Sequence, residues 1–455
     1  MNLIFVVGLV LLVVVGFLFG RSRANAAAQS SPLHSRPIYH GAFVAIAVLV
    51  PMLLVLVVGV PVANYIVESQ VLSGFELSLV DDSLKRSAIL RDVMAVVNGH
   101  YSGTPSATLQ RAADTYASTR ALANTLVLGT GLVFGLLGVA YGLRAISVQF
   151  RARNQVERFI KVALAVAASV AVLTTIGIVF SVLFETVRFF ERVSPLEFLF
   201  GLHWSPQTAI RADQAGSSGA FGIVPLVTGT LLITTIAMLI AGPIGLFTAI
   251  YLAEYATPRF RNWAKPILEI LAGIPTVVLG FFAALSLAPW LRESGWVLGL
   301  DVASESALAA GVVMGMMVIP FVSSLSDDVI NAVPQSLRDG SYAMGATKSE
   351  TIKKVVLPAA FAGIVSAFML AISRAVGETM IVVMAAGLAA NLTFNPLEAV
   401  TTFTVQIKTI LVGDQEFDSA KTLSAFALGF VLFFFTLTLN VIALQIVKRY
   451  REQYD

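Results

Sequence analysis

Nine long apolar runs constrain this chain more than any other feature of its sequence. A helix needs roughly 20 mainly apolar residues to cross the hydrocarbon core of a membrane. The runs lie at about 3–19, 41–66, 122–143, 162–184, 222–250, 266–290, 306–324, 364–388 and 422–447. Only 13% of the 455 residues are charged and 57% are hydrophobic, which excludes a soluble globular protein. No stretch predicts a sheet, so we predict an all-α polytopic membrane protein with about nine transmembrane helices.

The distribution of lysine and arginine predicts how these helices are oriented. With the N-terminus outside, the inside segments hold 18 basic residues and the outside segments hold 11. Those inside segments are 20–40, 144–161, 253–265, 325–363 and the tail from 448. We therefore expect the N-terminus outside and the C-terminus in the cytoplasm.

The first run could instead be a signal peptide, because Ala24-Asn25-Ala26 resembles a cleavage site. It lacks a basic segment before the apolar run, however, and it carries Arg21 and Arg23 on its far side. We therefore predict a retained helix.

Several kinds of chemistry are excluded by composition. The chain has no cysteine, which rules out disulfides and cysteine-based catalytic or metal sites. The histidines lack metal-ligand spacing, and we expect loop positions and no metal role for all of them: His34, His40, His100 and His203. The net charge of +3 is dispersed among loops without a dense patch, so we expect no nucleic-acid partner.

A polar segment from Val333 to Ile364 separates two apolar runs and must leave the bilayer. Pro334 suits the first turn of one helix, and Thr347 with Glu350 forms a capping-box pattern that starts a second. Gly345 lies between them, where the chain can turn. We expect Leu357-Pro358 to end this compact tab, because proline cannot continue a helix unperturbed.

The spacing in this segment resembles the coupling motif of ABC importer membrane subunits. The matching positions are Asp339-Gly340-Ser341, Gly345 and Val355-Val356-Leu357-Pro358, and the start departs from the usual Glu-Ala-Ala. The string SLRDGSYAMGATK is similar to phosphate permeases of the PstC type. The resemblance implies that the tab docks in the cleft of a separate ATPase. It also implies that the chain lies in a bacterial inner (plasma) membrane. Gly340 and Gly345 also have P-loop spacing, but Ala346 follows where that motif has lysine, so we expect no enzyme activity and no cofactor in this chain.

The same resemblance is nearly continuous from about residue 158. It includes GTLLITTIAMLIAGPIGLFTAIYLAEY from Gly229 and KPILEILAGIPTVVLGF from Lys265, and it implies a MetI-like permease core over 158–455. Residues 1–150 lie outside the resemblance and are expected to form an extension of three transmembrane helices. Its extracytoplasmic segment 67–121 is expected to be either short amphipathic helices or a plain spacer. In the third run, one stripe of glycines predicts close helix packing: Gly131, Gly135, Gly138 and Gly142.

Arg374 and Glu378 are the only charges in the eighth apolar run. Their spacing of four residues would put them on one face of a helix, where they could pair. An arginine fork matches phosphate oxygens, and a carboxylate can accept a hydrogen bond from hydrogen phosphate but not from sulfate. The run SRAVGET also resembles that of phosphate permeases. We therefore assign both residues to a substrate pathway, with a salt bridge that fixes helix packing as the alternative.

The resulting hypothesis is the membrane subunit of an ATP-driven phosphate importer. The resemblance implies a second, PstA-type permease chain, a pair of ATPase subunits and an extracytoplasmic phosphate-binding protein as partners, besides membrane lipid. One alternative keeps this architecture and transports molybdate or sulfate. Another is a stand-alone secondary anion transporter, which would show comparable internal halves that we do not find. A regulatory role through the ATPase contact could coexist with transport.

Overall fold

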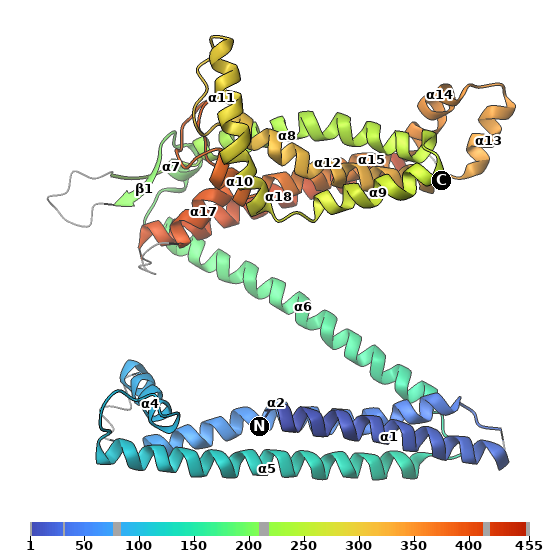
Figure 1. The fold of residues 1–455 in the computed structure, drawn as a ribbon, viewed down its shortest axis with the longest axis vertical. Coiled ribbons are helices and arrows are strands. Elements are labelled where there is room, and N and C mark those ends of the chain that lie inside the picture. Colours follow the sequence, from blue (N-terminus) through green and yellow to red (C-terminus); the bar gives the residue numbers. More distant parts are fainter. Residues whose placement is uncertain (1, 31, 76–82, 209–217, 413–418, 452–455) are drawn as a thin grey trace. The chain divides into compact units, whose positions relative to one another are not determined.

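The computed structural model describes residues 2–30, 32–75, 83–208, 218–412 and 419–451 (Figure 1). The chain divides into two compact units, Met1–Leu173 and Thr174–Asp455. Within the described residues, nine helical segments are long and apolar enough to cross a membrane. Each of them overlaps one of the predicted runs, so the prediction of a helical membrane protein with nine spans is confirmed.

The first unit is a bundle of long helices. Its elements are α1 (Asn2–Ser30), α2 (Pro37–Leu72), α4 (Ser83–Val97), α5 (Ala107–Ala145) and the first part of α6 (Ala152–Phe190). Between residues 67 and 121, α4 packs Val93 into a small core with Leu109 and Val67, so this segment forms a helix against the ends of α2 and α5. Residues 76–82 of the segment lie outside the described residues.

Close packing at the glycine stripe of α5 is confirmed. All four glycines are buried. A Cβ at Gly142 would lie 3.0 Å from the Cα of Val44 in α2, and one at Gly135 would lie 2.6 Å from the sulfur of Met52. The absence of side chains therefore lets the backbone of α2 approach α5 closely.

The second unit places α12 (Ala307–Ala332) at the centre of its core. Its first half is α7 (Pro195–Phe200), β1 (Trp204–Thr208), β2 (Ser218–Phe221), α8 (Val224–Ile250), α9 (Pro258–Ala272), α10 (Thr276–Phe282) and α11 (Ala288–Val297). Its second half is α13 (Gln335–Ala343), α14 (Lys348–Thr351), α15 (Leu357–Val376), α16 (Met380–Ala385), α17 (Phe403–Leu411) and α18 (Ala420–Arg451). Three π-helical turns continue helices: η1 (Tyr251–Tyr255), η2 (Ala283–Leu287) and η3 (Ile352–Val356). The face of α12 toward α8 carries Gly311 and Gly315, where a Cβ would meet Ile236 and Ile240, so these two helices also pack closely.

Two expectations about local structure were wrong. The antiparallel pair β1–β2 forms a small sheet in which Trp204 is opposite Phe221. Alternating apolar residues did not reveal it, because the strands are only five and four residues long. His40 is not in a loop but in the first turn of α2, where it is fully buried beside Phe150.

Candidate coupling tab and broken membrane helices

Residues 334–356 form a compact projection, which we call the tab. Pro334 precedes α13 as its N-cap, and Gly345 turns the chain with a φ of +83°, a conformation that favours glycine. At the start of α14, Thr347 Oγ1 accepts a hydrogen bond from Glu350 N, and Thr347 N donates to the Glu350 carboxylate. The predicted helix, turn and capping box are therefore present. A hydrogen bond of 2.8 Å between the Ser341 and Thr351 hydroxyls joins α13 to α14.

The tab ends directly before Leu357-Pro358, but the expectation that this proline interrupts the helix was wrong. The chain passes from α14 through the π-turn η3 directly into α15, with Pro358 in the first turn of that helix. The wider π-turn accommodates a residue that has no N–H to donate. The tab therefore continues into a membrane helix without an intervening loop.

Arg338 fastens the tab to the rest of the second unit. The residue is only 7% exposed, and its Nε and Nη2 donate to Glu254 Oε1 in η1 at 3.0 and 2.9 Å. Nη1 donates to the carbonyl of Val333 at 2.6 Å, and Nη2 also donates to that of Ile330 at 2.8 Å. Ile330 lies in the last turn of α12 and Val333 is the C-cap of that helix, and the Ile330 carbonyl also accepts a hydrogen bond from Val333 N at 3.3 Å. One side chain thus joins the tab to the ends of two core helices.

The other face of the tab is exposed and partly apolar. Met344 is 88% exposed at its tip, and Leu337 and Tyr342 are also exposed. Asp339 and Gly340 lie exposed in α13, and a Cβ at Gly340 would meet nothing within 4 Å. This face is therefore free to contact another protein.

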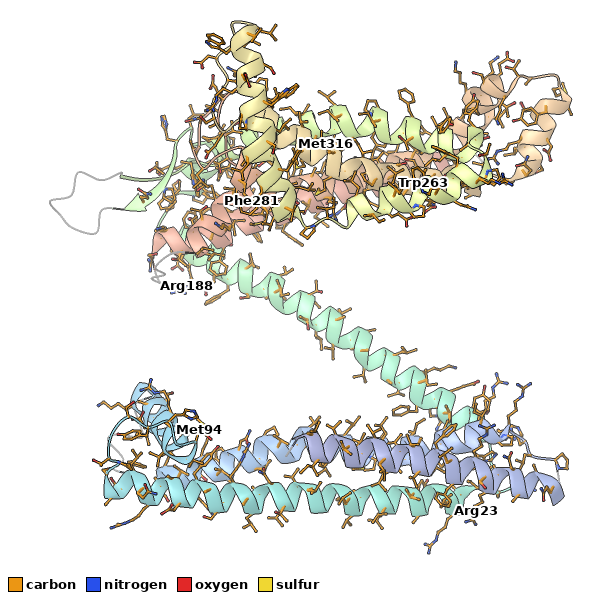
Figure 2. All side chains as sticks on the ribbon, in the orientation of Figure 1. Arg23, Met94, Arg188, Trp263, Phe281 and Met316 are labelled. Carbon is orange, nitrogen blue, oxygen red and sulfur yellow. The ribbon has the colours of Figure 1, made fainter. Side chains whose placement is uncertain are left out.

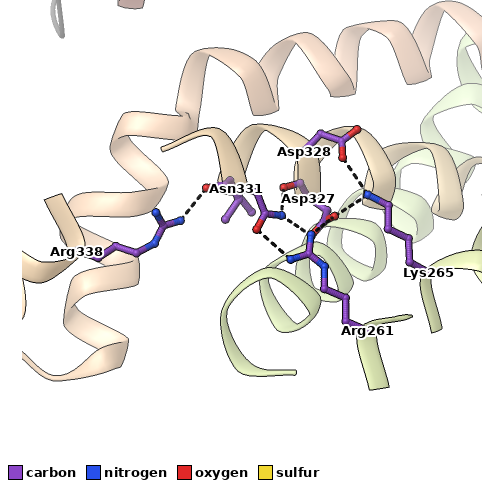
Figure 3. A network of polar contacts seen from close by, with 7 residues as sticks. Arg261, Lys265, Asp327, Asp328, Asn331 and Arg338 are labelled. Atoms are coloured by element: carbon purple, nitrogen blue, oxygen red, sulfur yellow. Dashed lines mark hydrogen bonds and ion pairs between the residues drawn. The ribbon is translucent and has the colours of Figure 1, made fainter. Parts of the chain in front are cut away.

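A polar cluster at the same end of α12 was missed from the sequence (Figure 3). Asp327 is 1% exposed, and its carboxylate accepts hydrogen bonds from Arg261 Nη2 and Lys265 Nζ in α9, each at 2.9 Å. Lys265 also reaches Asp328 at 2.9 Å, and Asn331 binds both Asp327 and Arg261. The hydrogen bonds to Asp327 and then Asp328 raise the pKa of the Lys265 ammonium, which therefore stays charged at neutral pH. The spacing of four residues between Arg261 and Lys265, which puts them on one helical face, was the feature of the sequence that could have indicated this cluster.

Two predicted membrane spans are broken. Residues 266–290 do not form one helix, because α9 ends at Ala272 and α10 begins at Thr276, after Pro275. Residues 364–388 do not either, because α15 ends at Val376 and α16 begins at Met380. The two short helices that follow these breaks pack together, with Gly280 of α10 against Met380 and Met384 of α16.

The second break separates Arg374 from Glu378, so the expectation that they share one helical face was wrong. Glu378 Oε1 accepts hydrogen bonds from the backbone N–H groups of Met380 and Ile381 at 3.0 and 3.4 Å and thereby caps the new helix. The guanidinium of Arg374 lies 5.9 Å from the centre of the Phe321 ring in α12. Gly377 is the C-cap of α15 and has a φ of −84°.

The sequence of the second unit matches known permeases. Residues 241–452 match the family described as "Binding-protein-dependent transport system inner membrane component". The chain is 34% identical to the probable ABC transporter permease protein YqgH of Bacillus subtilis, over 59% of this chain and 81% of that protein. It is 32% identical to phosphate transport system permease protein PstC 1 of Mycobacterium tuberculosis, over 57% of this chain and 83% of that protein.

This chain belongs to the PstC-type family of ABC transporter permeases. The predicted family is therefore confirmed. The permease is also 34% identical to phosphate transport system permease protein PstA 1 of Mycobacterium tuberculosis, over 37% of this chain and 51% of that protein. Residues 6–174 match a separate family, which is described as "Phosphate ATP-binding cassette transporter".

Proposed function

We propose that this permease is the membrane subunit of an ATP-driven importer of inorganic phosphate and forms half of its translocation pathway. The observation that carries the proposal is the tab, a folded projection attached to α8 and α12 through Arg338, in a chain of the PstC-type family. Such a projection can pass movement of a docked protein to the membrane helices. The cargo is proposed from the relatives, which are named phosphate permeases.

An importer of this kind needs several partner proteins besides this permease. A pair of separate ATPase subunits supplies ATP hydrolysis and holds ATP and Mg²⁺, so the permease itself is not an enzyme and holds no cofactor. A related PstA-type chain forms the other half of the pathway, and an extracytoplasmic binding protein delivers phosphate. We place the permease in a bacterial inner (plasma) membrane with its N-terminus outside, so that the tab and C-terminus lie in the cytoplasm. Residues 1–150 would then be an extension of a permease core over 158–455.

We propose separate roles for the predicted site residues. Asp339, Gly340, Ser341, Gly345, Leu357 and Pro358 belong to the structure that couples to the ATPase. Arg374 and Glu378 belong to the substrate pathway, where the guanidinium would bind phosphate oxygens. Both backbone hydrogen bonds of Glu378 use Oε1, so Oε2 is available to accept a hydrogen bond from the protonated oxygen of hydrogen phosphate.

Reconstituted uptake tests the proposal. The permease, a PstA-type chain, the ATPase subunits and the binding protein are assembled in proteoliposomes, and uptake of labelled phosphate, sulfate and molybdate is compared with and without ATP. We expect ATP-dependent uptake of phosphate and little uptake of the other two anions. Faster uptake of sulfate or molybdate would contradict the cargo, and uptake by this chain alone without ATP would contradict the ABC mechanism.

A further inference from the structure

The first unit collects basic side chains at one end of its helix bundle. The sequence separates them into 20–40 and 144–161, but the fold brings the two segments together. His34 N donates to Val148 O at 3.2 Å, Arg153 N donates to Ser35 Oγ at 3.2 Å, and the Phe43 and Phe150 rings lie 4.8 Å apart. The end of α1, the start of α2, the end of α5 and the start of α6 therefore meet here, and Figure 2 marks the place with Arg23.

The charge at this place, which we call the basic end, is almost entirely of one sign. The two segments contain eight basic residues and one acidic residue, Glu157. All eight basic residues are exposed: Arg21, Arg23, Arg36, Arg144, Arg151, Arg153, Arg158 and Lys161. Within the described part of these segments, Glu157 neutralises Arg153 alone, through an ion pair of 2.6 Å between Nε and Oε1. The expectation that basic residues form no dense patch was wrong for this end of the molecule.

Three basic residues of the second unit are used differently. Arg261 and Lys265 bind the buried Asp327, and Arg338 binds Glu254. These three side chains form ion pairs within the second unit. In the basic end, by contrast, the two segments contain no carboxylate other than Glu157, so most of the positive charge is not neutralised there. A partner with several negative charges would complement it.

The position of these charges relative to the apolar spans identifies the partner. Arg144 directly follows Leu143, Lys161 directly precedes Val162, and Arg21 lies two residues beyond Phe19. At about 1.5 Å per residue, these charges lie within about 5 Å of the end of an apolar span. The headgroup layer on each side of a bilayer is about 5 to 8 Å thick. The guanidinium and ammonium groups therefore lie at the depth of lipid phosphates.

The helices that carry the charges also leave room for lipid around them. In the spans of α1 and α2, only 17% of the most apolar window is buried. We propose that the basic end is a binding surface for anionic phospholipid headgroups, which holds a shell of such lipids around the extension. The surface needs neither phosphate transport nor an assigned membrane orientation, so this inference is independent of the proposed function.

Energy transfer in the full chain can test the inference, because the chain has no cysteine and a single introduced one can carry a donor fluorophore. Ser147→Cys places the label at the basic end, and Ser102→Cys places a matched label in the exposed loop between α4 and α5. Each labelled chain is put into bilayer nanodiscs that contain acceptor-labelled phosphatidylglycerol or phosphatidylcholine. We expect transfer from position 147 to be about threefold greater with phosphatidylglycerol, given the attraction of clustered basic residues for anionic headgroups, and transfer from position 102 to be equal for the two lipids.

Two sets of variants then assign the effect to charge. The neutral set changes four residues to glutamine: Arg144, Arg151, Arg158 and Lys161. It should abolish the preference at position 147. The charge-keeping set changes Arg144, Arg151 and Arg158 to lysine and should retain the preference. It shows whether substitution at these positions abolishes the preference through misfolding instead of through loss of charge.

A control set changes Lys85, Arg86, Arg91 and Arg111 to glutamine and should also retain the preference. Raising the salt from about 0.1 M to 1 M should weaken it, because the Debye length falls from about 10 Å to 3 Å. Equal transfer to both lipids at position 147, or a preference that survives the neutral set, would overturn the inference. Loss of the preference when the ATPase subunits are added would show that an acidic protein surface, and not lipid, covers the basic end.

Discussion

At the scale of single residues, two side chains hold the functional region in shape, Arg338 through a contact between distant parts of the chain and Glu378 through a local one. Arg338 and Glu254 are 84 positions apart and form an ion pair whose side chains are 9% and 7% exposed. Glu378 caps α16 and thereby stabilises a break in a membrane-spanning segment. In both cases, the loss of stability caused by a substitution depends on whether the group that remains can still form a hydrogen bond or an ion pair.

We predict that Arg338→Gln destabilises the permease. Glu254 would be left as a buried charge without its partner, which costs about 3 to 5 kcal/mol in comparable cases. The midpoint of thermal unfolding in detergent should therefore fall, and the tab should become more accessible to protease. Arg259→Gln is the matched control, because Arg259 is an exposed arginine of α9. Equal unfolding midpoints for the two variants would contradict the prediction.

Glu378 allows its structural role to be separated from its proposed pathway role. Glu378→Gln keeps an amide oxygen that can accept the N–H of Met380, so we expect a normal unfolding midpoint but at least about a tenfold loss of phosphate uptake, equivalent to 1.4 kcal/mol or more. Glu378→Ala should also lose about 1 kcal/mol of stability, because the cap is removed. Normal uptake by Glu378→Gln in the assembled transporter would refute the pathway role.

At the scale of elements, glycines decide how closely helices approach and where the chain turns. Gly138 and Gly142 of α5 meet the α2 backbone, whereas Gly345 supplies a left-handed turn between α13 and α14 in open space. Two pairs of substitutions distinguish these causes, because each pair places the same methyl group in a different setting.

Gly345→Ala should destabilise the tab and Gly340→Ala should not. A Cβ at either position meets nothing within 4 Å, so any difference comes from the backbone. Gly345 has a φ of +83°, which costs an alanine about 1 to 2 kcal/mol, whereas alanine at the helical Gly340 gains about 0.5 to 1 kcal/mol. Hydrogen exchange of the α13 and α14 amides measures both effects. Faster exchange in Gly340→Ala than in Gly345→Ala would contradict the prediction.

Gly138→Ala should separate α5 from α2, because its Cβ would overlap the backbone of Ala47. We expect a loss of about 1 to 3 kcal/mol from overpacking. Gly129→Ala in the same helix meets nothing within 4 Å and should stabilise the helix by about 0.5 to 1 kcal/mol. Thermal unfolding of the two full-length variants compares them, and a Gly138→Ala variant as stable as Gly129→Ala would be inconsistent with the observed packing.

At the scale of the whole molecule, the two units have separate cores. Among the described residues, every cluster of buried apolar side chains lies within one unit. The α1–α2–α5 core contains Phe5 and Met52, and the core around α12 contains Met314 and Ile381. Each of these cores is therefore made of residues from its own unit.

We predict that a chain starting at Arg151 still inserts and assembles. It keeps all of α6 and four basic residues before the apolar part of that helix, Arg151, Arg153, Arg158 and Lys161, which should hold its new N-terminus on the inside. Co-purification with the ATPase and the PstA-type chain measures assembly, and protease protection reports orientation. A chain that inserts but no longer binds these partners would contradict the prediction and show that assembly requires the extension.

Much of the architecture is decided locally and could be predicted from the sequence. The apolar runs give the nine spans, because only a helix satisfies its own backbone groups in lipid. Thr347 and Glu350 fix the start of α14, since their capping box needs only neighbouring atoms. Gly345 fixes the turn for the same reason, through its own backbone conformation.

The tertiary structure alone decided which distant residues meet. It placed Glu254 on Arg338, Asp327 on Arg261 and Lys265, and two basic segments more than a hundred residues apart at one end of a bundle. It also decided that the run with Arg374 and Glu378 breaks at Gly377, which hydrophobicity cannot reveal because both halves are apolar. A local sequence pattern shows which secondary structure a segment can form. Which side chains pair and where a membrane helix breaks depend on the energy of contacts with segments that are remote in sequence.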